Sequence, residues 1–462
     1  MKLFINLKKV KLLNLLAFIF LISLLFQIVD GLFPIISMLL FKGIVILKNI
    51  HFKFIMILSL VIAWITSNSR IRGDLIKLFL IILIYLILET IYFNFYFNHS
   101  LDVIFLGFNK MYFYVFIIPF MLVMNDLVSE EIIINVLFLL FFLSSILGVS
   151  QNYLNNSIVP LESLDGYFQV QVYNFYNTIR AFSFFKVSLG FSFFCSFMSL
   201  IFIQILHKNK YLYSFFFLVS VYCVYISYSR SGYLIFIFSL INYWIMYRKN
   251  NFKLLYKLPF IYFLLGFFIS WSLLFLGKGF EKRSVLYWEN LTYETKNKLV
   301  FMLKERNFKN LEIYRDKELM LNFKKNEKIK NSYVLSKDSL IMRTFSWKEY
   351  SKIMLEDIKL LLIGTGIYGD SNVNVFSKFC LDNFYLEIIF HIGLIGFVLI
   401  VIFLYKIWDS LIRYNKESIL SKSNIAIFPT LFLSGFWSYI LPIYLSYFCL
   451  IFFVKNKNEN SY

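Results

Sequence analysis

Residues 131–149 read EIIINVLFLLFFLSSILGV, a run whose one charged residue stands at its start. An α-helix needs about 20 consecutive apolar residues to span the hydrocarbon core of a membrane, where the backbone must satisfy its own hydrogen bonds. The run therefore predicts a transmembrane helix. Similar apolar runs recur along the chain between short basic segments, so the pattern of this stretch decides the fold class.

The composition extends this prediction to the whole chain. Of its 462 residues, 60% are hydrophobic and 16% are charged, and the mean hydropathy is +0.71. Soluble globular domains are roughly 45–50% apolar, so the composition excludes that class. We expect an all-α polytopic membrane protein in contact with the lipid bilayer. The aromatic share of 21% adds volume and hydrophobicity but indicates no particular chemistry.

The apolar runs predict about twelve spans. The run at 425–454 is too long for one helix and contains Pro442, which indicates a hairpin of two helices broken at the proline. The run at 33–47 is apolar enough for a helix, but a span there would reverse the orientation given below, so we interpret it as re-entrant or interfacial. The other predicted spans are Leu12–Val29, Ile50–Thr66, Leu75–Tyr96, Val103–Met124, Phe184–Leu206, Tyr211–Tyr228, Gly232–Tyr247, Leu258–Gly277 and Phe384–Lys406.

Basic residues between the runs set the expected orientation. Lys and Arg number 46 against 27 Asp and Glu, a formal net charge of +19, and they cluster in short segments that alternate with loops poor in basic residues. Cytoplasmic loops carry such an excess, so both termini are predicted to lie in the cytoplasm. Because the charge follows the spans, nucleic acid is not an expected partner. The basic segments are 70–72, 207–210, 248–257, 406–422 and 455–457.

Cysteine and histidine residues are few and scattered. Neither set has the spacing of metal ligands or of a redox motif, and the chain lacks HExxH and P-loop motifs. The sequence therefore predicts no metal site and no cofactor. The residues concerned are Cys195, Cys223, Cys380 and Cys449, with His51, His99, His207 and His391.

One long segment, 278–381, interrupts the apolar pattern with a soluble composition. It is far longer than an ordinary connection between helices, and the orientation places it outside. The chain thus divides into a transmembrane bundle (1–277), a large, partly helical extracytoplasmic loop (278–381) and C-terminal transmembrane helices with a cytoplasmic tail (382–462). Within the loop, Arg343 lies on the apolar stripe of a predicted helix, four residues before Trp347, which indicates an anionic partner for its guanidinium.

Four basic residues are predicted beside spans on the outer side, against the insertion bias: Arg180, Lys186, Arg230 and Arg343. Arg keeps its charge and binds phosphate through two parallel hydrogen bonds, so such a cluster suits a pyrophosphate at the membrane surface. Snorkelling or ion pairing is the alternative, and it better explains any one of these residues taken alone. Arg230 is the exception, since a charge in a short turn between apolar runs is costly.

A second group of candidate residues lies where the loop returns to the membrane. Gly364 and Gly366 indicate a loop with unusual backbone angles or close approach to a ligand. Asp382 and Asn383 directly precede the span that begins at Phe384. Asp382 is therefore a candidate general base at the outer surface. The equally good alternative is that Asp382 and Asn383 cap the helix.

Other residues of the predicted spans have structural interpretations. Glu89 and Lys110 lie near the outer ends of their spans and are expected to pair with each other. Gly393 and Gly396 are interpreted as helix-packing positions. His391 is interpreted as a buried helix residue rather than a ligand.

Three pieces of the chain resemble, in this order, the O-antigen polymerase and O-antigen ligase family of bacterial membrane glycosyltransferases. They stand at 180–185 (RAFSFF), at 229–232 (SRSG) and at 343–396, the last running from Arg343 through GTG at 364–366 to GLIG at its end. Each motif is loose. Their order on a twelve-span frame, with a large outer loop before the last spans, is more specific, whereas the N-terminal third adds only hydropathy.

The resemblance implies a membrane glycosyltransferase of the bacterial inner membrane, whose active site faces the periplasm or the cell exterior. Its donor would be an oligosaccharide carried on undecaprenyl pyrophosphate, held electrostatically without a metal ion. A chain-length regulator is a candidate partner. The implied catalytic residues are Asp382, Arg230 and Arg343, and the implied substrate-binding residues are Arg180, Lys186, Gly364, Gly366 and Asn383.

Within this family, the ligase branch has His where this chain has Asp382. The difference favours a polymerase that extends a surface polysaccharide, O-antigen or capsule, by transferring the glycan to the next lipid-linked repeat unit. One alternative is an O-antigen ligase that transfers the finished chain to lipid A-core. Another is a lipid-linked oligosaccharide transporter, although the sequence shows no matching halves and its notable charges lie at the outer boundary.

Overall fold

The structure is a computed structural model, which describes a set of segments distributed over the chain. These are residues 2–32, 52–67, 73–97, 113–118, 128–156, 158, 172–173, 178–185, 187–249, 257–266, 355, 358–364, 384–414, 418–434 and 441–450. In these segments, the secondary structure is helical apart from one pair of very short strands. The predicted run at 33–47 lies outside them, as does most of the predicted outer loop at 278–381.

The elements keep the order of the apolar runs. They are α1 (Lys2–Ile28), α3 (Phe52–Ser67), α4 (Gly73–Phe97), α6 (Phe113–Ile117), α7 (Glu130–Tyr153), β1 (Val172–Tyr173), β2 (Thr178–Ile179), α8 (Ser188–Ile205), α9 (Lys210–Ile226), α10 (Arg230–Lys249), α17 (Ile358–Ile363), α18 (Phe384–Tyr414), α19 (Ile419–Ser434) and α20 (Leu441–Cys449). The strands β1 and β2 are antiparallel, with Val172 opposite Ile179 and Tyr173 opposite Thr178. A further helical segment spans Lys257–Gly266.

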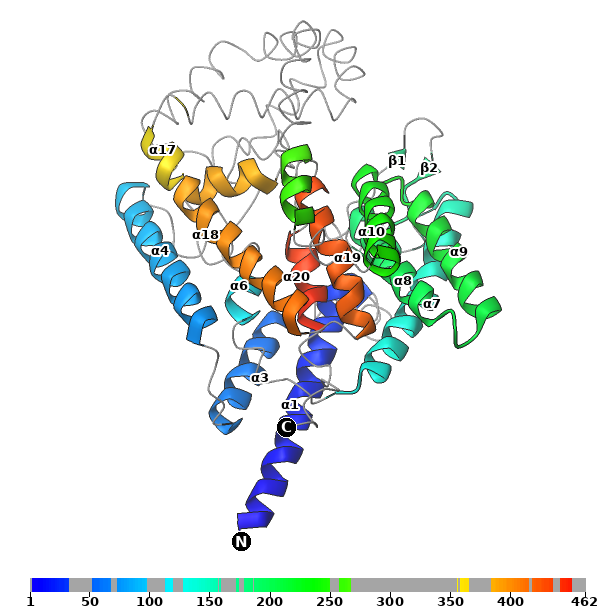
Figure 1. Cartoon of the computed structure of the whole chain (residues 1–462), viewed down its shortest axis with the longest axis horizontal. Coiled ribbons are helices and arrows are strands. Elements are labelled where there is room, and N and C mark those ends of the chain that lie inside the picture. Colours follow the sequence, from blue (N-terminus) through cyan, green and yellow to red (C-terminus); the bar gives the residue numbers. More distant parts are fainter. Residues whose placement is uncertain are drawn as a thin grey trace, which may run out of the picture.

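The helices form a bundle with two flanks (Figure 1). On one flank, α7, α8, α9 and α10 pack together, with β1 and β2 at one end of the group. On the other flank, α4 packs against α18, and α17 packs against α18 as well. The helices α1, α19 and α20 lie between the flanks. The N-terminus lies at the end of the molecule opposite α17 and the strands.

Hydropathy predicted several helices closely. The bounds of α3, α4, α9 and α10 agree with the predicted spans to within two residues at each end. Caps explain some of the boundaries: α7 begins where Ser129 Oγ accepts a hydrogen bond from Ile132 N–H, and α9 begins where Asn209 Oδ1 accepts one from Leu212 N–H.

Several predicted helix boundaries differ from the observed ones; α1, for example, begins at Lys2 and not at Leu12. The helix α8 begins at Ser188 instead of Phe184, because residues 178–185 are held in the non-helical segment described below. The run at 425–454 does form two helices, α19 and α20, and Pro442 lies in the first turn of α20, where a missing N–H costs nothing. The helix α18 reaches Tyr414 and is interrupted at Gly393, whose φ of 65° and ψ of −178° are not helical.

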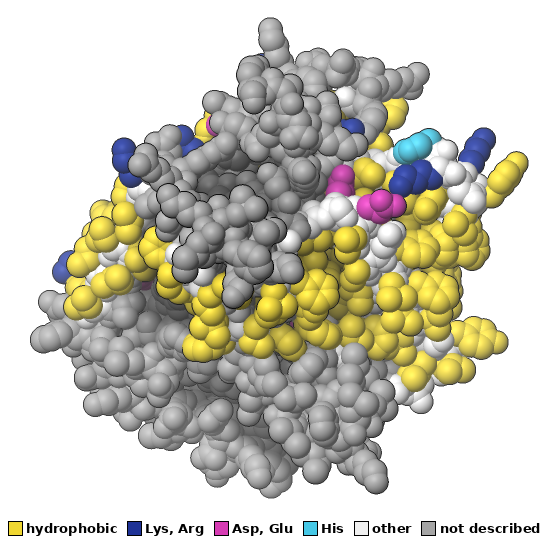
Figure 2. All heavy atoms as spheres, turned by 90° about the horizontal axis from the view of Figure 1, so that it is seen from below, with side chains coloured by type: hydrophobic (Ala, Val, Ile, Leu, Met, Phe, Trp, Pro, Cys, Tyr) yellow, Lys and Arg dark blue, Asp and Glu magenta, His cyan; other side chains and the backbone are white. Residues whose placement is uncertain are grey.

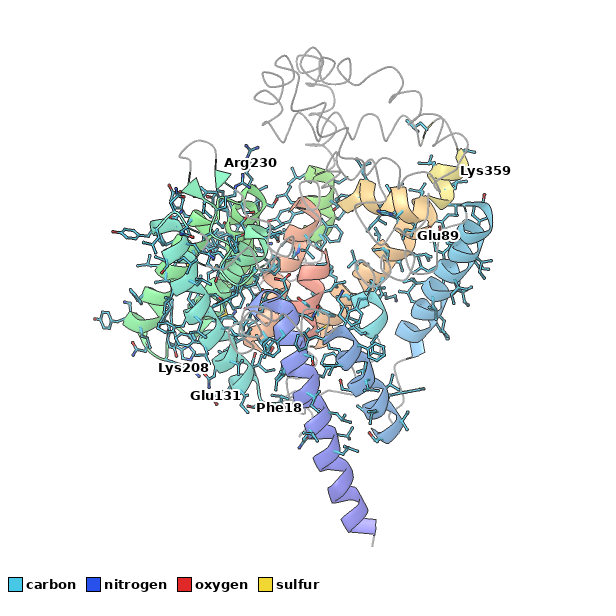
Figure 3. The ribbon with its side chains drawn as sticks, turned by 180° about the vertical axis from the view of Figure 1, so that it is seen from behind. Phe18, Glu89, Glu131, Lys208, Arg230 and Lys359 are labelled. Atoms are coloured by element: carbon cyan, nitrogen blue, oxygen red, sulfur yellow. The ribbon has the colours of Figure 1, made fainter. Side chains whose placement is uncertain are left out.

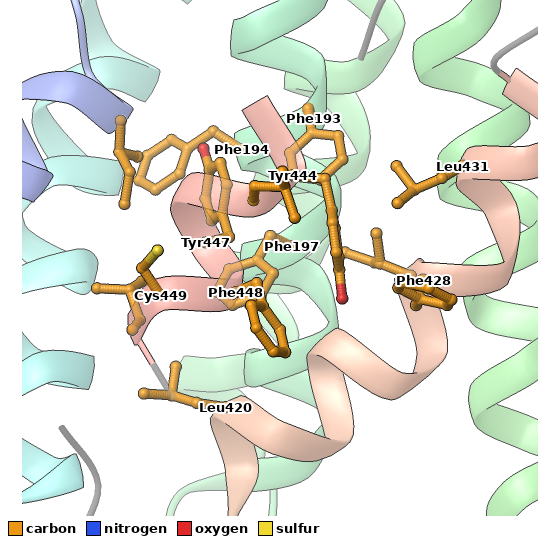
Figure 4. Close-up of a cluster of buried hydrophobic side chains, with 14 of the residues drawn as sticks. Phe193, Phe194, Phe197, Leu420, Phe428, Leu431, Tyr444, Tyr447, Phe448 and Cys449 are labelled. Atoms are coloured by element: carbon orange, nitrogen blue, oxygen red, sulfur yellow. The ribbon is translucent and has the colours of Figure 1, made fainter. Parts of the chain in front are cut away.

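An aromatic core joins α8, α19 and α20 (Figure 4). Tyr447 of α20 packs between Phe193 and Phe197 of α8, with ring centroids 5.0 and 4.9 Å apart. Phe428 of α19 stacks on Trp408 of α18 at 5.0 Å. Between lipid-embedded helices, such close packing is a main source of association, because lipid tails are as apolar as the side chains.

Side-chain amides also connect these helices. Asn242 of α10 donates from Nδ2 to the carbonyl oxygen of Ala426 in α19 at 2.8 Å and accepts the Tyr262 hydroxyl at 2.7 Å. Gln204 of α8 donates to Ser423 Oγ of α19 at 2.8 Å. These amides fix how α8 and α10 face α19, since a polar group in an apolar environment needs its partner.

The described surface is strongly apolar. Large side chains such as Phe18, Phe54 and Leu218 are more than half exposed, at 54%, 68% and 64%. Seen from below, hydrophobic side chains cover most of the described surface, and charged side chains stand in small groups at its margins (Figure 2). Among the residues that the structure describes, three helical stretches are long and apolar enough to cross a membrane: Glu130–Tyr153, Ser188–Ile205 and His391–Asp409. The structure is thus compatible with an all-α membrane protein, while twelve spans stay a prediction.

Candidate functional site

The segment around Arg180 is held in place by the C-terminal end of α7. Gln151 is fully buried there, and its Oε1 accepts hydrogen bonds from the backbone N–H groups of Phe182 at 3.2 Å and Ser183 at 2.8 Å. On the other side of Arg180, Asn155 Oδ1 accepts the N–H of Ile179 at 2.8 Å. The backbone is therefore fixed both before and after the arginine.

The backbone of the segment that Gln151 and Asn155 hold also turns sharply at Ser183. Ser183 has a positive φ of 52°, and its hydroxyl donates to the carbonyl oxygen of Ser144 at 2.7 Å. The Gly31 N–H, just beyond α1, donates to the carbonyl oxygen of Phe184 at 2.7 Å. A residue in the left-handed region persists where its surroundings hold it, and here α1 and α7 do so.

The same segment is joined to the turn between α9 and α10. Ala181 N–H donates to the carbonyl oxygen of Ile226, the last residue of α9, at 3.1 Å. The chain then turns through Tyr228, whose φ is 47°, and α10 begins at Arg230. Arg180 and Arg230 therefore stand on two backbone segments that are hydrogen-bonded to each other, although fifty positions separate them in the sequence.

Polar groups at the start of α10 define how Arg230 is presented. Ser229 Oγ accepts the N–H of Gly232 at 3.2 Å, the bond expected of a residue that caps a helix. Gly232 lies so close to α8 that an added Cβ would collide with Ser192 Oγ. The start of α10 is thus pressed against α8, which leaves the long Arg230 side chain to extend outward, where it is exposed.

The electrostatics of this end favour an anion. Arg230 occupies the first turn of α10, where the unpaired N–H groups of the helix add a partial positive charge. Arg180 is half-buried in the adjoining segment. Figure 3 shows Arg230 at the end of its flank opposite Lys208 and Glu131. Two guanidinium groups and a helix N-terminus on adjoining backbone suit a phosphate or pyrophosphate.

The other sequence-predicted site residues divide into two groups. Gly364 lies in the described part, at the end of α17, with a φ of +90° that explains the need for glycine. It packs against the interruption in α18, where an added Cβ would lie 2.5 Å from Gly393 N. Lys186, Arg343, Gly366, Asp382 and Asn383 lie outside the described residues. The candidate base therefore keeps both of its interpretations, although α18 does begin directly after Asn383.

Sequence reasoning missed the residues that position Arg180. Gln151, Asn152 and Asn155 come directly after the apolar run at 131–149, and they read as an ordinary polar loop. Their signal was the clustering of three amides at a helix end, since amides are suited to bind backbone groups. The partner segment, 178–185, could not be found from this signal alone.

No group of three or more His, Cys, Asp or Glu residues in the described segments is placed to hold a metal ion. Comparison with known proteins adds no assignment: no protein-family model, no curated protein and no solved structure matches the chain.

Proposed function

We propose that this chain is a membrane glycosyltransferase that polymerises a surface polysaccharide from repeat units carried on undecaprenyl pyrophosphate. The observation that carries the proposal is the joining of the Arg180 segment to the turn that bears Arg230, through the hydrogen bond from Ala181 to Ile226. A bundle with an apolar surface and a cationic group at one end matches a substrate with a lipid tail and a pyrophosphate head.

In the proposed reaction, a hydroxyl oxygen of the acceptor sugar attacks the anomeric carbon of the donor glycan. The bond between that carbon and the pyrophosphate oxygen breaks with inversion, and undecaprenyl pyrophosphate leaves with the electron pair. Arg230 and Arg343, with Arg180 and Lys186, neutralise the charge that develops on the leaving group. Asp382 accepts the hydroxyl proton, and Asn383, Gly364 and Gly366 take part in binding the substrate.

The first experiment compares the surface glycans of a strain lacking the gene with those of the complemented strain by gel electrophoresis. A polymerase predicts that single repeat units still reach the surface while the long-chain ladder disappears. Long chains that persist on the lipid carrier indicate the ligase instead. An unchanged profile argues against both transferases.

A second experiment decides the role of Asp382. Replacing Asp382 by Asn keeps a residue that caps helices well but removes the base. Loss of polymerisation in a normally inserted Asp382→Asn protein supports catalysis, whereas full activity assigns the residue to helix capping. Asn383→Asp is the matched comparison, because it also exchanges a carboxylate and an amide at the start of α18.

A further inference from the structure

The interruption of α18 is held by a side chain from another helix. Tyr85 of α4 donates its hydroxyl to the carbonyl oxygen of Ile392 at 2.6 Å. Ile392 directly precedes Gly393, where the backbone leaves the helical path. Gly364 of α17 packs against this same interruption. The Tyr85 hydroxyl thus tethers the point at which α4, α17 and α18 come together.

Glu89 lies one turn after Tyr85 on the same face of α4. Its residue exposure is 3%, and neither carboxyl oxygen has a hydrogen-bond partner in the described part of the structure. The carboxyl lies near enough to the Tyr85 hydroxyl to interact with it electrostatically. Figure 3 labels Glu89 on the side of α4 that faces α18.

A buried carboxylate without a partner is too costly to remain ionised in an apolar bundle, so this arrangement fits the protonated acid. A metal ion is a poorer occupant, because hard cations need several oxygen ligands and the described residues contain no ligand cluster of three or more.

We propose that Glu89 is a proton-binding site, and that its protonation decides whether Tyr85 holds the interruption in α18. With the proton bound, Tyr85 donates to Ile392, as observed. When the Glu89 carboxyl releases its proton to water, the carboxylate accepts the Tyr85 O–H, since hydrogen bonds to charged acceptors are stronger. The Ile392 carbonyl then loses its tether, and the packing of α17 on α18 is released. This proposal does not rest on the proposed glycosyl transfer, although Gly364 belongs to both.

Other titratable groups near the site must be separated from Glu89. His391, 5% exposed, directly precedes Ile392 and carries an ionisable imidazole side chain. Tyr385 of α18 donates to the carbonyl oxygen of Phe432, which directs it toward α19. Lys77 of α4 and Lys359 of α17 are exposed. His391 is therefore the group that a test of pH dependence has to control.

The test uses dicyclohexylcarbodiimide, an apolar reagent for protonated carboxyl groups, on the full chain in detergent micelles over a pH series, with mass spectrometry of the adducts. We expect labelling of Glu89 at neutral pH and its loss at alkaline pH. Glu131, which is exposed, serves as an internal control and should react with a water-soluble carbodiimide instead. A Glu89 that takes no label at any pH overturns the proton site.

Two variants test the exchange of partners. Tyr85→Phe removes the group that stabilises the carboxylate, so the pH at half-maximal labelling should rise by about one unit. His391→Gln should leave it unchanged. An unmoved midpoint in Tyr85→Phe, or an equal shift in His391→Gln, contradicts the exchange. Infrared difference spectra of the wild type give a variant-free check: the protonated-carboxyl band should fall together with a shift of the tyrosine C–O band, and an unshifted tyrosine band also contradicts it.

Discussion

Arg230 is the residue on which the pyrophosphate proposal depends most directly, because it is exposed in the first turn of α10. Arg230→Ala should lower the rate of polymerisation of a lipid-linked repeat unit about 10²–10³-fold, the usual cost of removing one group that stabilises a developing anion. Arg230→Lys should recover part of the rate, since it keeps the charge but loses the two-pronged geometry. The assay is a time course with purified protein in nanodiscs.

The matched control for this prediction is Lys208→Ala. Lys208 is also exposed and basic, but it lies at the opposite end of the same flank (Figure 3). Lys208→Ala should leave the rate of polymerisation within twofold of wild type. Equal losses in the two variants would mean that net charge, and not the position of Arg230, supports activity.

Gln151 represents a different kind of residue, one that acts on the site only by holding its backbone. Gln151→Ala leaves the buried N–H groups of Phe182 and Ser183 without their acceptor, which should cost about 2–4 kcal/mol of unfolding free energy. Denaturation of the detergent-purified protein measures the loss. Asn156→Ala, an exposed change three residues beyond α7, should stay within about 0.5 kcal/mol. A Gln151→Ala protein of wild-type stability would show that these two hydrogen bonds are not needed for stability.

Among the helices, the interruption in α18 leads to a specific prediction about stability. Gly393 has a positive φ, and an added Cβ would collide with the carbonyl oxygen of Leu362 in α17. Gly393→Ala should therefore destabilise the protein by more than about 3 kcal/mol or abolish its folded yield. Val398→Ala, on an exposed position of the same helix, is the control. Size-exclusion profiles and thermal unfolding compare them, and a normal Gly393→Ala protein would contradict the observed path of α18.

At the scale of the whole molecule, the ends of the bundle should lie on opposite sides of the membrane. Tyr153, at the end of α7 near Arg180, and Tyr211, at the start of α9, are 86% and 88% exposed. In spheroplasts, a membrane-impermeant maleimide should label Tyr153→Cys directly, and Tyr211→Cys only after permeabilisation. Both variants also carry Cys380→Ser. The native cysteines Cys195, Cys223 and Cys449 are buried, so background labelling should be low. Labelling from the same side would refute the predicted orientation.

Local sequence was enough to predict the class of this protein and the positions of several helices. Hydropathy is a local property: about 20 apolar residues must form a helix in lipid whatever their neighbours are. That is why the bounds of α3, α4, α9 and α10 could be predicted closely. The backbone requirement of Gly364 was equally visible, since it depends on one residue's own angles. Arg230 could also be singled out from the sequence, because a charged residue in a short turn between two apolar runs is costly.

The contacts between distant residues could not be predicted in this way. A polar residue in an apolar run indicates that it needs a partner, but its type and spacing do not say which one. Gln151 is hydrogen-bonded to the backbone at 182–183. Tyr85 is hydrogen-bonded to Ile392, which lies more than three hundred residues away in the sequence. Glu89 was expected to pair with Lys110, which lies outside the described residues, and the structure places it beside Tyr85. Such contacts are fixed by how the helices pack, which depends on the shapes of all their faces at once and not on any one segment.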